Sequence, residues 1–385
     1  MVSSITLIGT LPPIKGVSDY CIQQTEQFTK TMNVEFYNFK SIYPEFLYPG
    51  KTKEKDTVFA VPQSPRLIVH ETLSWYNPIG WIATGLKAKG EIVHFQWWTY
   101  FLFPVFFTIA VLAKWRGKKI VCTVHNVLGH ESGFLDRFLS KLIFSIPHAL
   151  IVHTQANKKQ LQEFFGISSR KIRVIPHGIY TFYRDAEVSK KESRQKIGVP
   201  SNARALLFFG HLRPYKGVED LIDAFISAKK KIPALFLIIA GKPWNSEYRK
   251  TIQEKLACQT DYKLVFDYIA SSDIKNYFFA SDVVVLPYKH FEAQSGPGNI
   301  ALAFEKPLLV SATGGLPELV QNPQCIFKAG DIQELIRKLE WVFSKKSILN
   351  SMQQDSHTLT KRYSWPVLAE ETIGLYNELI NKPNQ

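Results

Sequence analysis

Short apolar runs rich in β-branched residues alternate along this chain with helix-length amphipathic stretches, and this alternation constrains the fold more than any other feature. The runs are bounded by turn residues and include "SITLIG", "EIVHFQ", "KIVCTVH", "ALLFFG", "ALFLIIAG" and "DVVVLPY". Such alternation is typical of buried parallel strands joined by crossover helices. The sequence therefore predicts an α/β fold with parallel sheets.

The alternation restarts near residue 205, and 385 residues are enough for two domains of ordinary size. The polar, charged stretch 183–204 before the restart suits an interdomain connection. Two doubly wound sheets are the expected result. Because such sheets bind ligands beyond the carboxyl ends of their strands, functional residues are expected in the turns after the strands.

The turn at 209–217, "FGHLRPYKG", joins the apolar run "ARALLFF" to the helix-like continuation "VEDLIDAF". It holds a glycine and two cations, Arg213 and Lys216, at the mouth of the next helix. Backbone donors, the helix dipole and fixed cations converge in such a turn, and all three favour phosphate. The sequence predicts that a phosphorylated ligand binds here.

A formal net charge of +14 indicates an acidic partner: nucleic acid, anionic lipid or a phosphorylated substrate. No RNP, zinc-finger or helix-turn-helix pattern is present, so nucleic acid is not expected. The N-terminus has too short an apolar run for a signal peptide and is expected to form the first strand. The four cysteines lack zinc-binding spacing and favour a reducing, cytosolic compartment: Cys21, Cys122, Cys258 and Cys325.

Residues 97–113 are uncharged and apolar on every side. The segment is short for a membrane-spanning helix and lies between two predicted strands of one sheet, which argues against a transmembrane pass. A buried crossover helix is one expectation. The other is a helix that docks on a membrane surface, because aromatic residues begin the segment and cations follow it at 114–119. A peripheral membrane contact would then involve residues 97–119.

Two turns in the first half of the chain are candidates for ligand contact. Gly16 follows the first predicted strand, where a glycine lets the backbone approach a ligand. Three histidines, His94, His125 and His153, end predicted strands, and most such histidines only satisfy hydrogen bonds. His125 is the exception, because the "NVLGHE" after it is polar and turn-like.

The segment 291–307 follows the predicted strand "DVVVLPY" and opens a helix with "SGPG". Amides at such a helix start could hold a diphosphate, while Glu292 and Gln294 could hydrogen-bond hydroxyls. The alternative is a purely structural turn. A second glycine turn, at 314–318, comes after the neighbouring strand and favours the ligand-binding interpretation.

No Asp-x-Asp occurs, so no carboxylate pair for a magnesium-bridged diphosphate is expected, and neither is a metal or other cofactor. Charge on a leaving phosphate would have to be neutralised by Arg213, Lys216 and helix amides. The cations of the turn at 209–217 would then take part in the reaction.

The order and spacing of these motifs resemble GT-B glycosyltransferases of family 4, a group of retaining enzymes that use nucleotide sugars. The resemblance covers nearly the whole length, from the turn at Gly16 to the closing "YSWPVLAEETIGLYNEL". It is carried by "TVHN", "VIPHG", "FGHLRPYKG", "LIIAG", "DVVVLPY" and "FEKPLLVSATGGLPELV". Each motif alone is weak, and the shared order makes the resemblance specific.

The resemblance implies two Rossmann-like domains that face each other across a cleft. Residues 1–182 would bind the acceptor, residues 183–365 would bind the donor, and a last helix within 366–385 would return to pack on the first domain.

The resemblance also implies roles for single residues. Lys216 and the nearby Arg213 would hold the donor diphosphate, His125 would contact the donor sugar, and Glu292 would hold sugar hydroxyls. These four form the expected catalytic set. The residues expected to bind the donor are Gly16, Gly210, His211, Gln294, Ser295, Gly296 and Gly298.

Two positions depart from the family pattern. His211 stands where an arginine usually follows the glycine, and Arg213 could substitute from its shifted position. Ile300 stands where a second glutamate usually accepts hydrogen bonds from the ribose. Losing that contact would cost about 1.5–3 kcal/mol of donor affinity unless another group replaces it.

These observations together predict a retaining glycosyltransferase that uses a nucleoside-diphosphate sugar. The expected acceptor hydroxyl belongs to a lipid-linked or polysaccharide precursor at the cytoplasmic face of the membrane. The expected location is the cytoplasm, with peripheral contact to the inner face of the cell membrane. The alternatives are a non-catalytic scaffold of the same fold, which His211 and Ile300 would favour, and a sugar-nucleotide epimerase.

Overall fold

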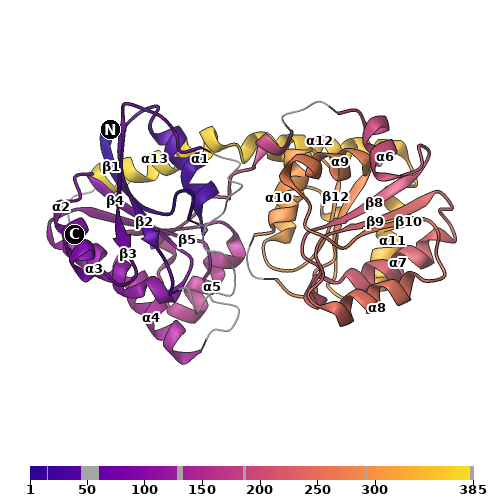
Figure 1. The fold of residues 1–385 in the computed structure, drawn as a ribbon, viewed down its shortest axis with the longest axis horizontal. Helices are drawn as coiled ribbons and strands as arrows, with labels where there is room; N and C mark the ends of the chain where they lie inside the picture. The colour runs from indigo at the N-terminus through magenta and orange to yellow at the C-terminus, as the bar shows by residue number, and fades with distance from the viewer. Residues whose placement is uncertain (15, 45–59, 128–132, 185–187, 292–293, 382–385) are drawn as a thin grey trace. The chain divides into compact units, whose positions relative to one another are not determined.

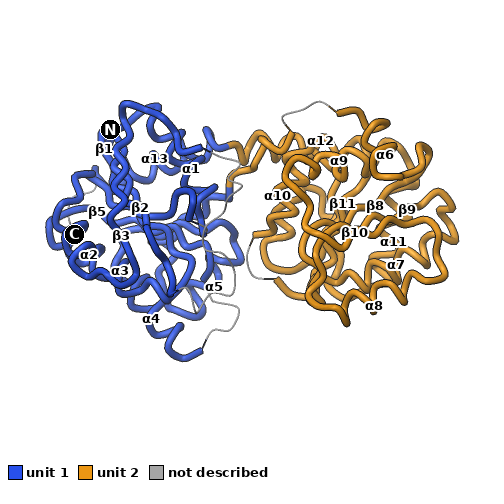
Figure 2. The backbone as a smooth tube through the Cα atoms, viewed as in Figure 1, with its two compact units in different colours: residues 1–177, 365–385 blue, residues 178–364 orange. Residues whose placement is uncertain are grey.

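The computed structural model describes residues 1–14, 16–44, 60–127, 133–184, 188–291 and 294–381. The chain forms two compact units: unit 1 is residues 1–177 with 365–385, and unit 2 is residues 178–364 (Figure 2). Each unit has a sheet of parallel strands flanked by helices (Figure 1). The predicted α/β class with two doubly wound sheets is confirmed.

The sheet of unit 1 has seven strands in the order β3-β2-β1-β4-β5-β6-β7. The order reverses at β1, which pairs with β2 on one side and with β4 on the other. Gly16 follows β1 and His125 follows β5, so both lie beyond carboxyl ends of strands. The strands are β1 Ser4–Gly9, β2 Asn33–Ser41, β3 Leu67–Ser74, β4 Ile92–Trp97, β5 Lys119–Val124, β6 Ala149–Val152 and β7 Ile172–Val174.

The α-helices of unit 1 are α1 Ser18–Phe28, α2 Pro78–Lys87, α3 Phe103–Trp115, α4 Phe134–Ser145, α5 Gln155–Phe165 and α13 Trp365–Asn381. Short 3-10 helices lie at Tyr100–Leu102 and Ser169–Lys171.

The last helix, α13, belongs to unit 1 although 187 residues of unit 2 precede it in the chain. Tyr376 is fully buried, and its hydroxyl lies 2.5 Å from His94 Nδ1. Asn377 accepts a hydrogen bond from the Val2 amide, and Glu378 pairs with Arg173. The return of the C-terminal helix to the first domain is thus confirmed.

The uncharged segment 97–113 is divided between three elements. Trp97 ends β4, a 3-10 turn comes next, and α3 begins with Pro104 in its first turn, where a missing amide hydrogen costs nothing. The positions Val105, Phe106 and Ile109 of α3 are buried in the core of unit 1. This agrees with the expected buried crossover helix. In the part of the chain that the structure describes, no helix has the length and apolarity needed to cross a bilayer.

The sheet of unit 2 has six strands in the order β10-β9-β8-β11-β12-β13. The order reverses at β8, which pairs with β9 and β11. Ligand sites in such sheets lie beyond the strands at this reversal. The strands are β8 Arg204–Phe209, β9 Leu235–Ala240, β10 Tyr262–Val265, β11 Val283–Leu286, β12 Leu308–Ser311 and β13 Ile326–Phe327.

The α-helices of unit 2 are α6 Lys190–Ile197, α7 Val218–Lys229, α8 Ser246–Leu256, α9 Ser271–Ala280, α10 Gly296–Ala303, α11 Ile332–Val342 and α12 Lys346–Arg362. Its 3-10 helices are Thr181–Arg184, Pro214–Lys216, Leu316–Leu319 and Pro323–Cys325.

The stretch expected to be an interdomain connection contains a helix, α6. Ser189 and Glu192 form a capping box at its start, and Gly198 ends it in the left-handed conformation. Arg194 is buried and pairs with Asp282 near β11. This part of the stretch is therefore an integral element of unit 2.

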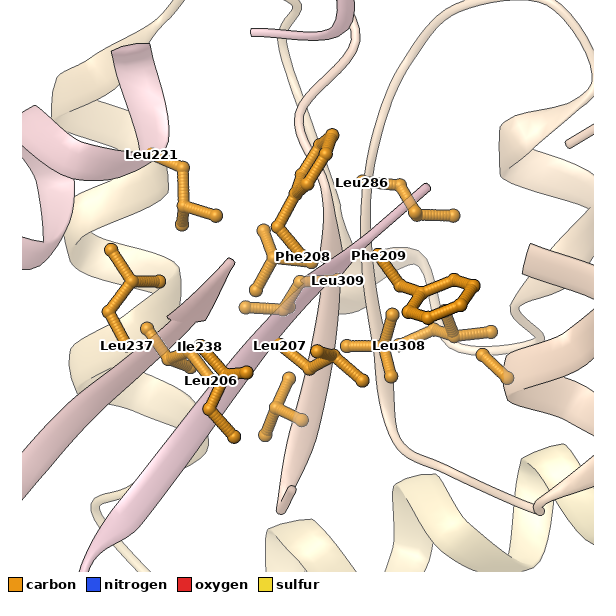
Figure 3. Close-up of a cluster of buried hydrophobic side chains, with 14 of the residues drawn as sticks. Leu206, Leu207, Phe208, Phe209, Leu221, Leu237, Ile238, Leu286, Leu308 and Leu309 are labelled. Carbon is orange, nitrogen blue, oxygen red and sulfur yellow. The ribbon is translucent and has the colours of Figure 1, made fainter. Parts of the chain in front are cut away.

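The core of unit 2 lies on both faces of its sheet (Figure 3). Side chains alternate along β8, so that Leu206 and Phe208 point to one face and Leu207 and Phe209 to the other. Leu221 of α7 covers one face, and leucines of β11 and β12 continue the layer (Figure 3). Burial on both faces explains why β8 is apolar throughout from Ala205 to Phe209.

Candidate active site

The turn between β8 and α7 brings the Lys216 ammonium next to Gly210. A side chain at Gly210 would begin 3.6 Å from Lys216 Nζ and 2.9 Å from Pro297 Cγ, so only glycine fits. Lys216 is 8% exposed, and its Nζ lies 5.4 Å from the centre of the Tyr288 ring. Burial, and secondarily Arg213, lower the pKa of Lys216 to about 8. The ammonium is therefore charged at pH 7 but poorly solvated.

A pocket of about 270 Å³ opens beside Lys216 within unit 2. Its cationic part comes from the turns after β8 and β9, and its apolar part comes from the turn after β10 and from α9 and α10. A pocket of this kind offers charge to a phosphate and apolar surface to a flat ring. The residues that line it are Tyr183, Phe209, Gly210, His211, Lys216, Gly241, Lys242, Asp267, Tyr268, Ile269, Ser271, Ile274, Gly296, Pro297 and Ile300.

His211 lines the same pocket. Burial, then repulsion from Lys216, Arg213 and Lys242, lowers the pKa of His211. Its imidazole is therefore neutral at pH 7 in the free protein, and the fixed positive charge of the pocket comes from the two lysines. An anion bound there would raise the pKa of His211 and add a third charge.

Arg213 lies outside this pocket. Its guanidinium stacks 4.2 Å from the centre of the Trp244 ring, and it lines a neighbouring depression of unit 2 with Tyr215 and Lys289. The structure therefore brings Lys216, but not Arg213, together with the pocket-lining glycines. Arg213 still acts on the pocket through its charge, since it lowers the pKa of both Lys216 and His211.

The start of α10 contributes backbone to the pocket. Gly296 and Pro297 line it, while Ser295 is buried and caps the helix by accepting the Gly298 amide at 3.2 Å. Gly298 packs against Leu319, whose Cδ1 would lie 2.3 Å from an added Cβ. The side-chain hydroxyl of Ser295 and the Cα of Gly298 thus have structural roles here.

Two other residues of the same segment were expected to hold sugar hydroxyls. Gln294 accepts a hydrogen bond from Asn299 on α10. Glu292 lies outside the residues that the structure describes.

In unit 1, His125 is held at both ring nitrogens. Nε2 lies 2.9 Å from Gln96 Oε1, and Nδ1 lies 3.3 Å from His153 Nε2. The ring meets Tyr20 edge-on at 4.7 Å. Burial, then the neighbouring histidines His153, His177 and His94, lower the pKa of His125 well below its usual range. The imidazole is therefore neutral at pH 7.

The other candidates of unit 1 have structural partners. His94 is fully buried, with Nε2 at 2.8 Å from Thr123 Oγ1, and burial lowers its pKa to about 3. His153 Nδ1 donates to the Ile175 carbonyl, which fits a satisfied strand-end histidine. Gly16 lies beside Thr10, in a turn closed by the Val17 amide donating to Thr10 Oγ1.

Sequence reasoning missed several residues that the structure brings to these sites. Lys242, Asp267 and Tyr268 line the Lys216 pocket, and His177 lies 5.3 Å from His153, ring centre to ring centre. Lys242 comes directly after the predicted strand "ALFLIIAG", which was the available signal, whereas Asp267 and Tyr268 lay inside the predicted strand "YKLVFDYI", and β10 ends before them at Val265. Within the described ranges, no cluster of His, Cys, Asp and Glu side chains could hold a metal ion. That no metal takes part stays a prediction.

Comparisons with known families match both halves of the chain. The family model described as Glycosyltransferase Family 4 matches residues 42–181, and the model described as Glycosyl transferases group 1 matches residues 189–358. The two matches together cover most of the chain.

Similar curated proteins are glycosyltransferases. An uncharacterized glycosyltransferase of Methanocaldococcus jannaschii is 28% identical over 262 residues, which are 64% of this chain and 62% of the relative. The D-inositol 3-phosphate glycosyltransferase of Kineococcus radiotolerans is 22% identical over 60% of this chain and 57% of its own. The GDP-mannose:glycolipid 4-beta-D-mannosyltransferase of Xanthomonas campestris pv. campestris is 28% identical over 238 residues, which are 58% of this chain and 62% of the relative. The chain thus spans less than two thirds of each of these relatives.

Solved structures share the fold along the whole chain. Sucrose-phosphate synthase from Thermosynechococcus elongatus has a TM-score of 0.72 at 17% identity and covers 98% of this chain and 99% of its own. Anabaena HepE in complex with UDP and glucose has a TM-score of 0.69 at 15% identity, and the match covers 98% of this chain and 100% of HepE. The chain belongs to the family 4 glycosyltransferases and has their GT-B fold.

Proposed function

We propose that this chain is a retaining glycosyltransferase that moves a sugar from a nucleoside diphosphate to an acceptor hydroxyl. Unit 2 binds the donor, and unit 1 binds the acceptor. The observation that carries the proposal is the Lys216 pocket, where a poorly solvated ammonium lies among glycine turns at the strand-order reversal of unit 2. Charge in such a place stabilises an anion more strongly than it would in water.

The leaving diphosphate takes the cationic part of the pocket in this proposal. Lys216 neutralises it first, Lys242 adds charge, and amides at the start of α10 add the helix dipole. Arg213 contributes from its place against Trp244. These groups supply the stabilisation without a metal ion.

Retention results from displacement on a single face of the sugar. The bond between the anomeric carbon and the phosphate oxygen breaks, the acceptor oxygen bonds to that carbon on the same face, and the acceptor proton passes to the leaving phosphate. His125 contacts the donor sugar in this scheme. Since burial and the neighbouring histidines hold the pKa of His125 well below its usual range, it is a poor base, and its role is to position the sugar.

The acceptor is a lipid-linked or polysaccharide precursor in this proposal. The mannosyltransferase similar to this chain is named for a glycolipid acceptor. The net charge of +14 is suited to a substrate that lies on an anionic surface.

Donor binding, with the base and sugar of the donor, is tested by thermal unfolding with UDP-, GDP- and ADP-sugars. A donor present at a hundred times its Kd should stabilise the chain by about 2.7 kcal/mol, which corresponds to a rise of several degrees in Tm for a unit of this size. The free nucleosides are the control, because they lack the diphosphate that Lys216 binds. A protein that no nucleotide sugar stabilises would contradict the proposal.

A further inference from the structure

The helix α4 of unit 1 exposes large apolar side chains that no described element covers. Phe134 is 88% exposed, Leu135 59% and Phe138 51%, and Leu142 comes one turn later. Burying this much apolar surface in an apolar phase is worth several kcal/mol. We call these four residues with Arg137 and Lys141 the α4 face.

The α4 face is continuous on the helix. At about 100° per residue, the four apolar side chains fall within an arc of about 100°, and Arg137 and Lys141 lie in an adjoining arc of about 40°. The opposite side of α4 is the buried one, with Ser140, Ile143 and Phe144 among its residues. An apolar stripe beside a basic stripe is the pattern of helices that lie in a membrane interface.

The charges identify what can cover this face. The one acid of α4, Asp136, is buried and accepts the Ser140 hydroxyl. At the end of the helix, Lys171 and Lys114 donate to the last carbonyls, which adds positive charge nearby. A second copy of the chain would bring like charges together on the same patch. An anionic lipid surface complements both stripes.

Among the residues that the structure describes, the segment 97–119 has fewer exposed apolar side chains and fewer unengaged cations for a membrane contact than α4 has. Three of its cations are engaged with backbone carbonyls: Lys114 with Ile146, Arg116 with Ala88 and Lys118 with Lys89. Its helix α3 lies next to α4 (Figure 1) and buries five of its apolar residues in the core: Val105, Phe106, Ile109, Ala110 and Ala113. Trp115, 80% exposed, is the main apolar residue it presents.

We propose that the α4 face docks unit 1 onto anionic phospholipid. The proposal rests on the proposed function only for the location of the acceptor, so the two can fail separately. Phe134 and Phe138 enter the interface, while Arg137 and Lys141 meet lipid phosphates. The acceptor would then be met at the membrane surface.

Sedimentation with vesicles of equal parts phosphatidylcholine and phosphatidylglycerol tests the docking. Phe134→Ser with Phe138→Ser should lower the partition coefficient about tenfold or more. Arg137→Gln and Lys141→Gln should each lower it about fivefold at low salt and have little effect on phosphatidylcholine alone. All four residues are exposed, so Tm should stay unchanged.

Matched controls are Ile79→Ser with Ile82→Ser on α2, another exposed apolar pair of unit 1, and Trp115→Ser for the segment 97–119. Both should bind like the parent chain. The proposal would be overturned if either control variant lost vesicle binding while the α4 variants bound vesicles as the parent chain does. Absence of vesicle binding by the parent chain would also overturn it, as would a dimer in solution that the two serine substitutions on α4 dissociate.

A second inference comes from the Lys216 pocket and rests on the proposed function. Asp267, which comes after β10, is the one carboxylate among the described residues that line it. Its Oδ1 accepts the Tyr268 amide at 2.7 Å, which orients the carboxylate and leaves its other lone pairs for a ligand. Ile300 on α10 can offer the pocket only apolar contact.

The pocket thus presents cations, a carboxylate and apolar surface to a single ligand. A nucleoside diphosphate carries phosphates, a ribose diol and a flat base, which match these three kinds of surface in turn. A carboxylate accepts hydrogen bonds from two hydroxyls, and charged hydrogen bonds are the stronger class. We infer that Asp267 binds the ribose hydroxyls and supplies the acceptor that Ile300 lacks.

Calorimetric titration with UDP and GDP, each against its 2′,3′-dideoxy counterpart, tests this role. The parent chain should prefer the ribonucleotide about tenfold or more. Asp267→Ala should lose that preference while its affinity for the dideoxynucleotide stays the same. Asp273→Asn removes a nearby acid that pairs with Lys196, and it should keep the preference.

The outcomes separate the two claims. If neither ribonucleotide binds the parent chain, the proposed donor site fails. If a ribonucleotide binds and Asp267→Ala keeps the preference for it over the dideoxy form, the donor site stands and the role of Asp267 is overturned.

Discussion

Replacing Lys216 by methionine or alanine is expected to lower turnover by about 100-fold or more, because one preorganised charge on a leaving group is typically worth that much. Methionine keeps the aliphatic stem packed near Tyr288, so that variant should fold normally. Steady-state sugar transfer, or hydrolysis of the nucleotide sugar when no acceptor is known, measures the loss.

Lys306 provides a matched control for this experiment. Like Lys216 it is a lysine of unit 2 near an aromatic ring, Phe279, and burial lowers its pKa to about 8. Its ammonium, however, donates to the Ser281 carbonyl, before the amino-terminal end of β11 and away from the pocket. Lys306→Met should therefore leave turnover intact. Equal turnover in Lys216→Met and the parent chain would refute the assignment.

The pH dependence of nucleotide binding provides a second readout for Lys216. A lysine is charged below its pKa, which is about 8 here, so affinity for the diphosphate should be full at pH 7 and fall as pH rises through 8. At acidic pH, protonation of His211 adds a further positive charge and should strengthen binding. Lys216→Met should lose the alkaline decline and keep the acidic gain.

The sequence was sufficient to locate the strands whose two faces are buried, because burial on both faces leaves an uninterrupted apolar run. It failed for β2, where Glu35 and Asn38 interrupt the pattern. In the fold Glu35 accepts from the Thr6 hydroxyl and the Lys89 amide, and Asn38 accepts from the Leu11 amide. Partners so far apart in the chain make these polar residues compatible with a buried strand, and no local pattern reveals them.

The same limit applies to the candidate site. The position of Lys216 is set by the turn at 209–217, and this turn was recognisable from the sequence as a phosphate-binding turn. Arg213 was grouped with Lys216 because the two are close in sequence, but its guanidinium stacks on Trp244, which belongs to the turn after β9. Asp267 enters the pocket because β10 pairs with β9. Side-chain direction and strand order decide both cases, and neither is encoded locally.

Gly217→Ala is expected to cause a large loss of stability for the addition of a single methyl group. Gly217 has φ of +67°, in the left-handed region, and an added Cβ would lie 1.9 Å from the Pro287 carbonyl oxygen. The left-handed conformation costs an alanine about 1–2 kcal/mol, and overpacking adds about 1–3 kcal/mol. The free energy of unfolding should fall by about 3 kcal/mol or more.

Gly198→Ala separates the two costs. Gly198 has φ of +75°, close to that of Gly217, and an added Cβ there meets nothing within 4 Å. Gly198→Ala should lose only the conformational part of the stability, about 1 kcal/mol.

The two variants should also differ in nucleotide binding. Relief of the clash at Gly217→Ala must move the backbone at 287–288, which carries the Tyr288 ring near Lys216. Gly217→Ala should therefore weaken nucleotide binding, and Gly198→Ala should not. Chemical denaturation and calorimetric titration of both variants measure these effects. Equal losses of stability in the two variants would contradict the predicted clash with the Pro287 carbonyl.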